Sequence, residues 1–214
     1  MLPSTFDYVA ATSVEDAVKA LAAGGGDAKV IAGGQSLLPM MKLRLASPGT
    51  LVDINGIAGL DVLAEEDGWL RIGALVRHGD LERSDLVRER YPIIHDAAQH
   101  VADPLIRNRG TFCGSLCFAD PAADCPAGLV GLNGTVITNR RHIGADQFFK
   151  GLYETALDKG EIVTGVSFPI AEKAGWAKFA NLASRYAIVA VMVSKGREGA
   201  RVDRKSTRLN SSHM

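Results

Sequence analysis

The sequence predicts an α+β fold for this chain of 214 residues. Within residues 29–54 an apolar strand, a glycine-containing loop and a second strand follow one another, which is the order of a parallel βαβ unit. After residue 60 strand-like segments are joined by an Asp-Gly hairpin signal, and helical periodicity separates them from later strands. A chain of this length can bury a core as one large domain or two modest ones.

Capping residues define the first elements. Ser13 precedes Glu15 and Asp16, which predicts a helix N-cap followed by acidic residues in the first turn. The glycines at 24–26 end this helix, and a phosphate-binding loop is the alternative interpretation of that triplet. A strand, a turn with a short helix, and a second strand are expected at residues 29–32, 37–45 and 50–54.

After residue 60, short strands alternate with helices. Asp67-Gly68 predicts a hairpin, and Asn133-Gly134 predicts a turn into a further strand. The strands are expected at residues 60–64, 69–75, 135–138, 161–168 and 187–194. The helices are expected at residues 81–90 and 91–101, and from a turn at 120–124 to about residue 132. We interpret the polar stretch at residues 171–175 as a domain boundary.

Composition excludes several classes of protein. Lys plus Arg and Asp plus Glu both number 24, and this balance argues against a nucleic-acid or membrane-surface protein. No apolar run reaches the roughly 20 residues that span a bilayer, and the N-terminus lacks the features of a secretory signal. The three cysteines are an odd number, which disfavours a disulfide framework. We therefore expect a cytoplasmic protein.

The last eleven residues, 204–214, have a different character. They show no amphipathic period and end a strand-rich region abruptly. They resemble translated sequencing-adapter sequence, so we interpret them as non-native and outside the fold; a genuine polar tail is the alternative. On the first interpretation the final domain is truncated, and the strand at residues 187–194 keeps an unpaired edge.

Two glycine-containing segments carry most of the functional information. Residues 32–36 read Ala-Gly-Gly-Gln-Ser, and residues 111–115 read Thr-Phe-Cys-Gly-Ser. Each offers unhindered backbone N–H groups and a hydroxyl, and glycine lets main chain approach a ligand where a Cβ would collide. Two such loops can hold a pyrophosphate from opposite sides. For each loop alone, an ordinary turn is the alternative.

The surroundings of these glycines resemble the two FAD motifs of the molybdenum hydroxylase flavoprotein subunits. These are the medium subunits of xanthine dehydrogenase-type and carbon monoxide dehydrogenase-type enzymes. The first motif lies at residues 32–42, and the second lies at residues 106–116. The run Ala-Asp-Pro-Ala-Ala-Asp at residues 119–124 is similar to the acidic position that follows the second motif. The resemblance extends from residue 1 to about residue 203.

The resemblance implies a particular domain organisation. It predicts a FAD-binding domain of the vanillyl-alcohol-oxidase or PCMH type at residues 1–174. Two α+β subdomains, at about residues 1–57 and 58–174, would make up this domain. The start of the family's smaller C-terminal domain would occupy residues 175–203, and residues 204–214 would be the non-native tail.

The resemblance also assigns residues to a non-covalently held FAD. Main-chain amides and the hydroxyls of Ser36, Thr111 and Ser115 would hold the pyrophosphate. Asp124 would accept hydrogen bonds from a hydroxyl-bearing part of the cofactor, although it is equally a helix N-terminal carboxylate. The implied set is Val30, Ile31, Ala32, Gly33, Gly34, Gln35, Ser36, Leu37, Val101, Thr111, Phe112, Cys113, Gly114, Ser115, Asp124, Ile162, Lys178 and Tyr186.

Within this set, four side chains are expected to contact the cofactor or lie near it. Val101 would offer apolar contact, as would Ile162 or its neighbour Val163. Lys178 would place a cation there, with a solvated surface lysine as the alternative. Tyr186 would pack against the cofactor, and a core tyrosine is the alternative.

No metal ligands are expected in this chain. Cys113, Cys117 and Cys125 match neither common ferredoxin spacing, and the five histidines show no zinc-ligand spacing. Cys113 also departs from the resemblance, because the family often has glycine at this position. No histidine falls in a glycine segment, which agrees with a flavin that is not covalently attached.

The expected function is that of a FAD-binding electron-transfer subunit. In the family that this chain resembles, a large subunit oxidises substrate at a molybdenum cofactor. Electrons then pass through [2Fe-2S] centres of a small subunit to FAD and on to an external acceptor. The subunit would supply no acid–base dyad or nucleophile of its own. The alternatives are a stand-alone flavin-dependent oxidase of the same fold and a non-enzymatic assembly module.

Overall fold

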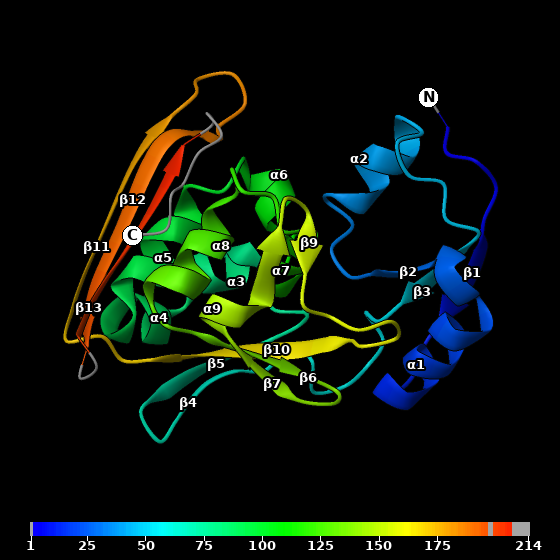
Figure 1. Cartoon of the computed structure of the whole chain (residues 1–214), viewed down its shortest axis with the longest axis horizontal. Coiled ribbons are helices and arrows are strands. Elements are labelled where there is room, and N and C mark those ends of the chain that lie inside the picture. Colours follow the sequence, from blue (N-terminus) through cyan, green and yellow to red (C-terminus); the bar gives the residue numbers. More distant parts are fainter. Residues whose placement is uncertain (1, 197–198, 207–214) are drawn as a thin grey trace.

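In the computed structural model, which describes residues 2–196 and 199–206, the chain is a mixed fold of helices and sheets. Figure 1 shows three parts along the chain: a small N-terminal sheet with its helices, a central sheet with helices above it, and a C-terminal sheet standing beside those helices. The expected mixture of helices and sheets is confirmed. The site residues lie where these parts meet.

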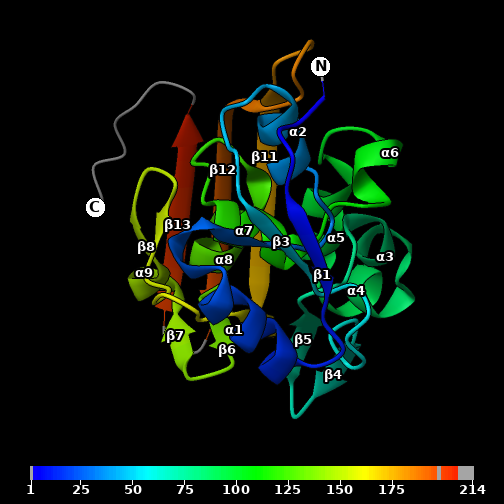
Figure 2. The same cartoon turned by 90° about the vertical axis from the view of Figure 1, so that its right-hand side faces the viewer.

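The N-terminal part is a parallel three-stranded sheet in the order β1-β3-β2, and α1 lies below its strands in Figure 2. Its elements are β1 (Asp7–Ala10), α1 (Val14–Ala23), the 3-10 turn η1 (Gly25–Asp27), β2 (Ala28–Ile31), α2 (Leu37–Lys42) and β3 (Thr50–Asp53). Ser13 caps α1 by accepting a hydrogen bond from the Asp16 amide at 3.1 Å, as expected. Sequence analysis missed β1, because all four of its residues are exposed and show no apolar alternation.

The central part is an antiparallel five-stranded sheet in the order β4-β5-β10-β6-β7. Its strands are β4 (Leu63–Glu66), β5 (Trp69–Gly73), β6 (Thr135–Thr138), β7 (His142–Gly144) and β10 (Val163–Pro169). The expected hairpin joins β4 to β5, and both Asp67 and Gly68 have positive φ, at 51° and 79°. The strand expected at residues 60–64 begins at Leu63 instead.

Short helices cover the upper face of this sheet in Figure 1. They are α3 (His78–Arg83), α4 (Asp85–Arg90), α5 (Pro92–Gln99), α6 (Pro104–Arg107), α7 (Phe112–Phe118), α8 (Asp124–Gly131) and α9 (Ala145–Phe148). The helical material expected at residues 81–90 is confirmed but divided between two helices, because Ser84 ends α3 and caps α4 through the Val87 amide. The rings of Phe112 and Phe168 meet edge to face at 5.6 Å and anchor α7 on β10.

The C-terminal part is an antiparallel sheet of β11 (Lys173–Ala180), β12 (Ala187–Gly196) and β13 (Gly199–Ser206). A separate two-stranded pair, β8 (Phe149–Gly151) and β9 (Glu154–Thr155), precedes it in the chain. The unpaired edge expected for residues 187–194 was wrong, because β12 is the central strand and β13 pairs with it up to Ser206. Three residues of the segment 204–214 therefore belong to the sheet; residues 207–214 lie outside the described residues.

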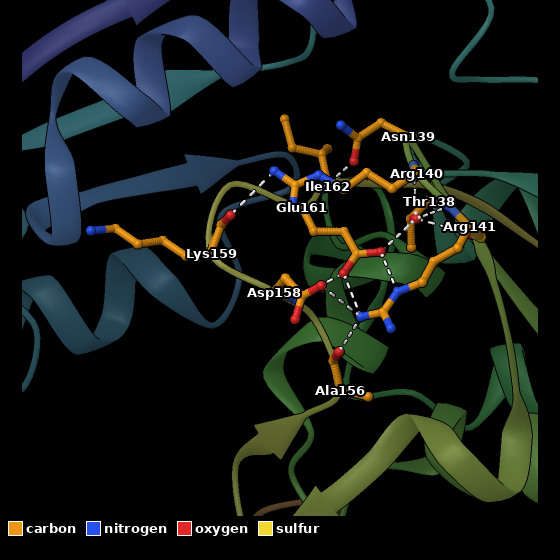
Figure 3. Close-up of polar contacts among 9 residues, drawn as sticks. All are labelled: Thr138, Asn139, Arg140, Arg141, Ala156, Asp158, Lys159, Glu161 and Ile162. Atoms are coloured by element: carbon orange, nitrogen blue, oxygen red, sulfur yellow. Dashed lines mark hydrogen bonds and ion pairs between the residues drawn. The ribbon is translucent and has the colours of Figure 1, made fainter.

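A cluster of hydrogen bonds ties the β6–β7 connection to the segment that leads into β10 (Figure 3). The Glu161 side chain is fully buried and accepts hydrogen bonds from Arg141 Nε at 3.0 Å and from Thr138 Oγ1 at 2.8 Å. The Arg141 hydrogen bond is the largest favourable influence, and it lowers the pKa of Glu161 to about 2 against the opposing effect of burial. Beside it, Asn139 Oδ1 accepts a hydrogen bond from the Ile162 amide at 2.9 Å.

Glu161→Gln is expected to lower the free energy of unfolding at pH 7 by about 1–3 kcal/mol, because Arg141 and Thr138 lose a charged acceptor. The folded-state pKa lies below the ordinary value of 4.5, so the wild-type contribution is complete above pH 4.5 and is lost as the pH falls towards 2. Urea denaturation at pH 7 and pH 3 checks this, with the exposed Glu66→Gln as control. An equal difference between wild type and E161Q at both pH values would contradict it.

Candidate functional site

The two glycine segments meet through their main chains. Strand β2 delivers residues 32–36 against the backbone that precedes α7. A Cβ atom added to Gly33 would lie 2.1 Å from the carbonyl oxygen of Arg109 and 2.8 Å from the Cα of Gly110. No side chain fits in that space, so glycine is required at position 33 by the close approach of the second segment. The atoms that Gly33 approaches belong to Arg109 and Gly110, which directly precede residues 111–115 and lie within the second motif at residues 106–116.

The first segment presents a row of backbone donors. Within the described residues, the five successive N–H groups from Gly33 to Leu37 donate no hydrogen bond to another part of the chain. Gly34 has φ +73°, a conformation that bends successive amides towards a common point. Buried or half-buried amides need a partner, and an anionic group is a partner that several amides can share. The hydroxyl of Ser36 caps no helix amide and lies beside them.

The second segment is the beginning of helix α7, which differs from the loop that the sequence suggested. Thr111 is the N-cap residue: its Oγ1 accepts from the Gly114 amide at 3.0 Å, and its carbonyl accepts from the Ser115 amide at 3.1 Å. The amides of Gly114 and Ser115 are therefore engaged within the helix. Those of Thr111 and Cys113 donate to no other described residue.

Cys113 turns away from this surface. Its side chain is buried, with Sγ 3.8 Å from the carbonyl oxygens of Ile72 and Gly73 on β5. Burial raises the pKa of the thiol well above its ordinary value. The departure from glycine at this position is accommodated by the core and leaves the outer surface of the segment unchanged.

A buried ion pair joins two further residues of the expected set. Lys178 Nζ on β11 donates to Asp124 Oδ2 at 2.6 Å and to the carbonyl of His100 at 3.1 Å. The two side chains are only 2% and 7% exposed, so the alternative of a solvated lysine was wrong. Asp124 is also the first residue of α8, and Val101 follows His100 in the chain. Three elements therefore converge on this pair.

Tyr186 lies near the same pair. Partial burial raises the pKa of its phenol, and Asp120 and Asp124 add to the effect. At 44% exposure it is not the core tyrosine of the alternative interpretation. Ile162 is buried directly before β10, where its backbone amide donates a hydrogen bond to Asn139 Oδ1. Ile162 belongs to the hydrophobic core that also contains Phe112 and Cys113.

Sequence analysis missed two residues that join the glycine segments, Arg77 and Asn55. Their side chains contact each other and the backbones of both segments. Neither belongs to a recognisable motif, and they lie far from each other and from the glycines in sequence. Because Arg77 and Asn55 come together only in the folded chain, no local sequence pattern indicates their contact.

The described residues give two further findings about the site. Nowhere in residues 2–196 and 199–206 do three His, Cys, Asp or Glu side chains stand where they could hold a metal ion. In the same part of the chain, none of the helices has the length and apolar character needed to cross a membrane.

The donors that are present at the glycine segments, a row of amides with two hydroxyls, fit the diphosphate of FAD in number and kind.

Comparison with known proteins agrees with this chemistry. The family described as "FAD binding domain in molybdopterin dehydrogenase" matches residues 4–171. The chain is 40% identical over 195 residues to the 6-hydroxypseudooxynicotine dehydrogenase complex subunit alpha of Paenarthrobacter nicotinovorans, covering 89% of this chain and 66% of that protein. It is 42% identical over 182 residues to the carbon monoxide dehydrogenase medium chain of Hydrogenophaga pseudoflava, covering 83% and 63%.

A solved structure of carbon monoxide dehydrogenase from Hydrogenophaga pseudoflava superposes with a TM-score of 0.90 at 38% identity, over 96% of this chain and 76% of that chain. The chain thus spans about two thirds of the length of these curated relatives. The match of residues 4–171, together with the paired glycine segments, places the chain in the family of FAD-binding domains of molybdopterin dehydrogenases, whose cofactor is FAD.

Proposed function

We propose that this chain is the FAD-binding electron-transfer part of a multi-subunit molybdenum hydroxylase. The observation that carries the proposal is the contact between the two glycine segments, with five amides that have no partner among the described residues. Relatives at about 40% identity are named as subunits of dehydrogenases of this kind, which supports it. The residues at the site bind and orient the cofactor, and FAD, when bound, supplies the capacity to accept and pass on electrons.

Each group of residues has a distinct task in this proposal. The amides of residues 33–37, with the hydroxyls of Ser36 and Thr111, would hold the diphosphate. Asp124, fixed by Lys178, would face a hydroxyl-bearing part of the cofactor, and Tyr186 would lie alongside. The Lys178 ammonium group, 2.6 Å from Asp124 Oδ2, would hold that carboxylate in one position, so that it can serve as a hydrogen-bond acceptor.

The wider organisation follows the family. We assign residues 1–174 to a PCMH-type FAD-binding domain, with subdomains at about 1–57 and 58–174, and residues 175–203 to the start of a C-terminal domain. The partners would be a large subunit with the molybdenum cofactor and a small subunit with [2Fe-2S] centres, assembled in the cytoplasm. Electrons would enter from the iron–sulfur centres and leave to an external acceptor.

Gly33→Ala is expected to weaken FAD binding at least tenfold, because its Cβ would press on the Arg109 carbonyl and separate the two segments. Wild-type protein should bind one FAD per chain and release it, unmodified, on denaturation. Titration with FAD, followed by quenching of flavin fluorescence, measures the change. Gly26→Ala is the matched control, since its Cβ meets no atom within 4 Å. Wild-type protein that stays colourless after reconstitution with FAD would overturn the proposal.

The FAD-loaded chain alone is expected not to oxidise an organic substrate, because the step at the molybdenum cofactor belongs to another subunit. Anaerobic mixing with purines, aldehydes, N-heterocycles or carbon monoxide should leave the visible absorbance of the oxidised flavin unchanged. Bleaching should follow only when molybdenum and iron–sulfur subunits are added. Rapid bleaching without partners would instead identify a stand-alone oxidase.

A further inference from the structure

Arg77 connects the two glycine segments from a position outside both. It lies between β5 and α3 and is the N-cap residue of α3. Its Nη1 donates to the carbonyl oxygen of Arg109 at 2.6 Å, and its Nη2 donates to Asn55 Oδ1 at 2.5 Å. One planar guanidinium group therefore binds acceptors from two parts of the chain, a geometry that a lysine ammonium group does not reproduce.

Asn55 carries this connection on to the first segment. Its Nδ2 donates to the carbonyl oxygen of Ala32 at 2.8 Å, directly before Gly33. Asn55 is itself held by Asp53, whose Oδ1 accepts from the Asn55 amide at 2.8 Å. The other oxygen of Asp53 accepts from the hydroxyl of Tyr8 at 2.5 Å. The path Arg109–Arg77–Asn55–Ala32 is named here the Arg77–Asn55 brace.

Both ends of the brace are main-chain carbonyls at the point where the segments touch. The Arg109 carbonyl is the group against which Gly33 packs, and it accepts a hydrogen bond from Arg77 Nη1. The backbone beside Arg77 holds the second segment as well: the His78 amide donates to Gly110, and the Phe112 amide donates to Val76. Val76 and His78 thus hold the second segment through main-chain hydrogen bonds, and the Arg77 side chain is connected to the first segment through Asn55.

Two carboxylates and one cation lie around Arg77, and the carboxylates help to hold it in place. Asp80 accepts from the Arg77 amide at 2.9 Å and, with Asp53, offsets the neighbouring Arg109 cation. Arg77 is half-buried, and both Nη atoms of its guanidinium group donate to protein acceptors, namely the Arg109 carbonyl and Asn55 Oδ1. The free amides of residues 33–37 remain the donors that an anion would meet.

We propose that Arg77 is a positioning residue for FAD: the Arg77–Asn55 brace sets the separation of the two glycine segments so that both reach one diphosphate. The inference rests on the proposed function, because it assumes that these segments hold FAD. Arg77 acts through the carbonyls of Arg109 and Ala32 and has no direct part in electron transfer. Removal of the brace would leave the backbone amides present but would no longer fix the distance between the two glycine segments.

The test compares Arg77→Met, Asn55→Ala and the double variant with wild type, and uses Arg88→Met as control. Arg88 makes only an exposed ion pair with Asp85, so the same substitution there removes an arginine without touching the segments. Dissociation constants for FAD and for FMN are measured by fluorescence titration of the full chain. Circular dichroism at the same temperature confirms that each variant is folded.

Arg77→Met and Asn55→Ala are each expected to weaken FAD binding 10- to 100-fold. The double variant should lose no more than about threefold beyond the weaker-binding single variant, because both substitutions break one brace. FMN, which carries one phosphate, should lose affinity by less than threefold. Arg77→Lys, which keeps the charge but not the fork, should lose about tenfold and provides a second test if Arg77→Met does not fold.

Three outcomes would overturn the brace. The first is a FAD affinity of Arg77→Met within twofold of wild type, or of Arg77→Lys if only that variant folds. The second is a loss of FAD affinity in the double variant equal to the product of the two single losses. The third is an equal loss of affinity for FAD and for FMN. Failure of the proposed function is distinguishable, because wild-type protein itself would then fail to bind FAD. Normal binding by wild type and Arg77→Met together would leave the proposed function standing and remove only the brace.

Discussion

The contact between Gly33 and the Arg109 carbonyl is the constraint on which the rest of the site depends. It brings the end of a parallel strand from the N-terminal sheet against the start of a helix on the central sheet, with no side chain between them. The geometry of each segment is ordinary by itself: one is a bend after a strand, and the other is a capped helix start. Their apposition turns two common features into a single surface of donors for an anion.

Features with a local cause could be predicted from the sequence. The Ser13 cap, the Asp67-Gly68 hairpin and the strand at residues 135–138 each depend on neighbours within a few residues, and all three are present. The resemblance of residues 32–42 and 106–116 to known FAD motifs pointed to the family that the comparison then showed. Glycine at position 33 was recognised as important, although the neighbour that demands it was not visible in the sequence.

Features created by distant residues could not be predicted. Arg77 and Asn55 are 22 positions apart, and Lys178 is 54 positions from Asp124. Residues 204–206 were set aside with the tail because it shows no amphipathic period, yet backbone pairing with β12 requires no particular side chain. The helical start at Thr111 was missed because glycine and serine inside the segment favoured a loop. In the ion pair, the Arg77–Asn55 contact and β13, a distant partner outweighed local preference, whereas the start of α7 is set by the local cap at Thr111.

The buried Lys178–Asp124 pair has a consequence for the order of assembly. Asp124 belongs to α8 and its cationic partner Lys178 lies on β11, so Asp124 reaches its final environment only when the C-terminal sheet docks. A buried carboxylate without its cation costs about 3–5 kcal/mol. Docking of the sheet and completion of this edge of the site are therefore one cooperative event. A ligand that requires Asp124 in place therefore stabilises the docked position of β11–β13. By the same linkage, a substitution that destabilises this sheet lowers the affinity for that ligand.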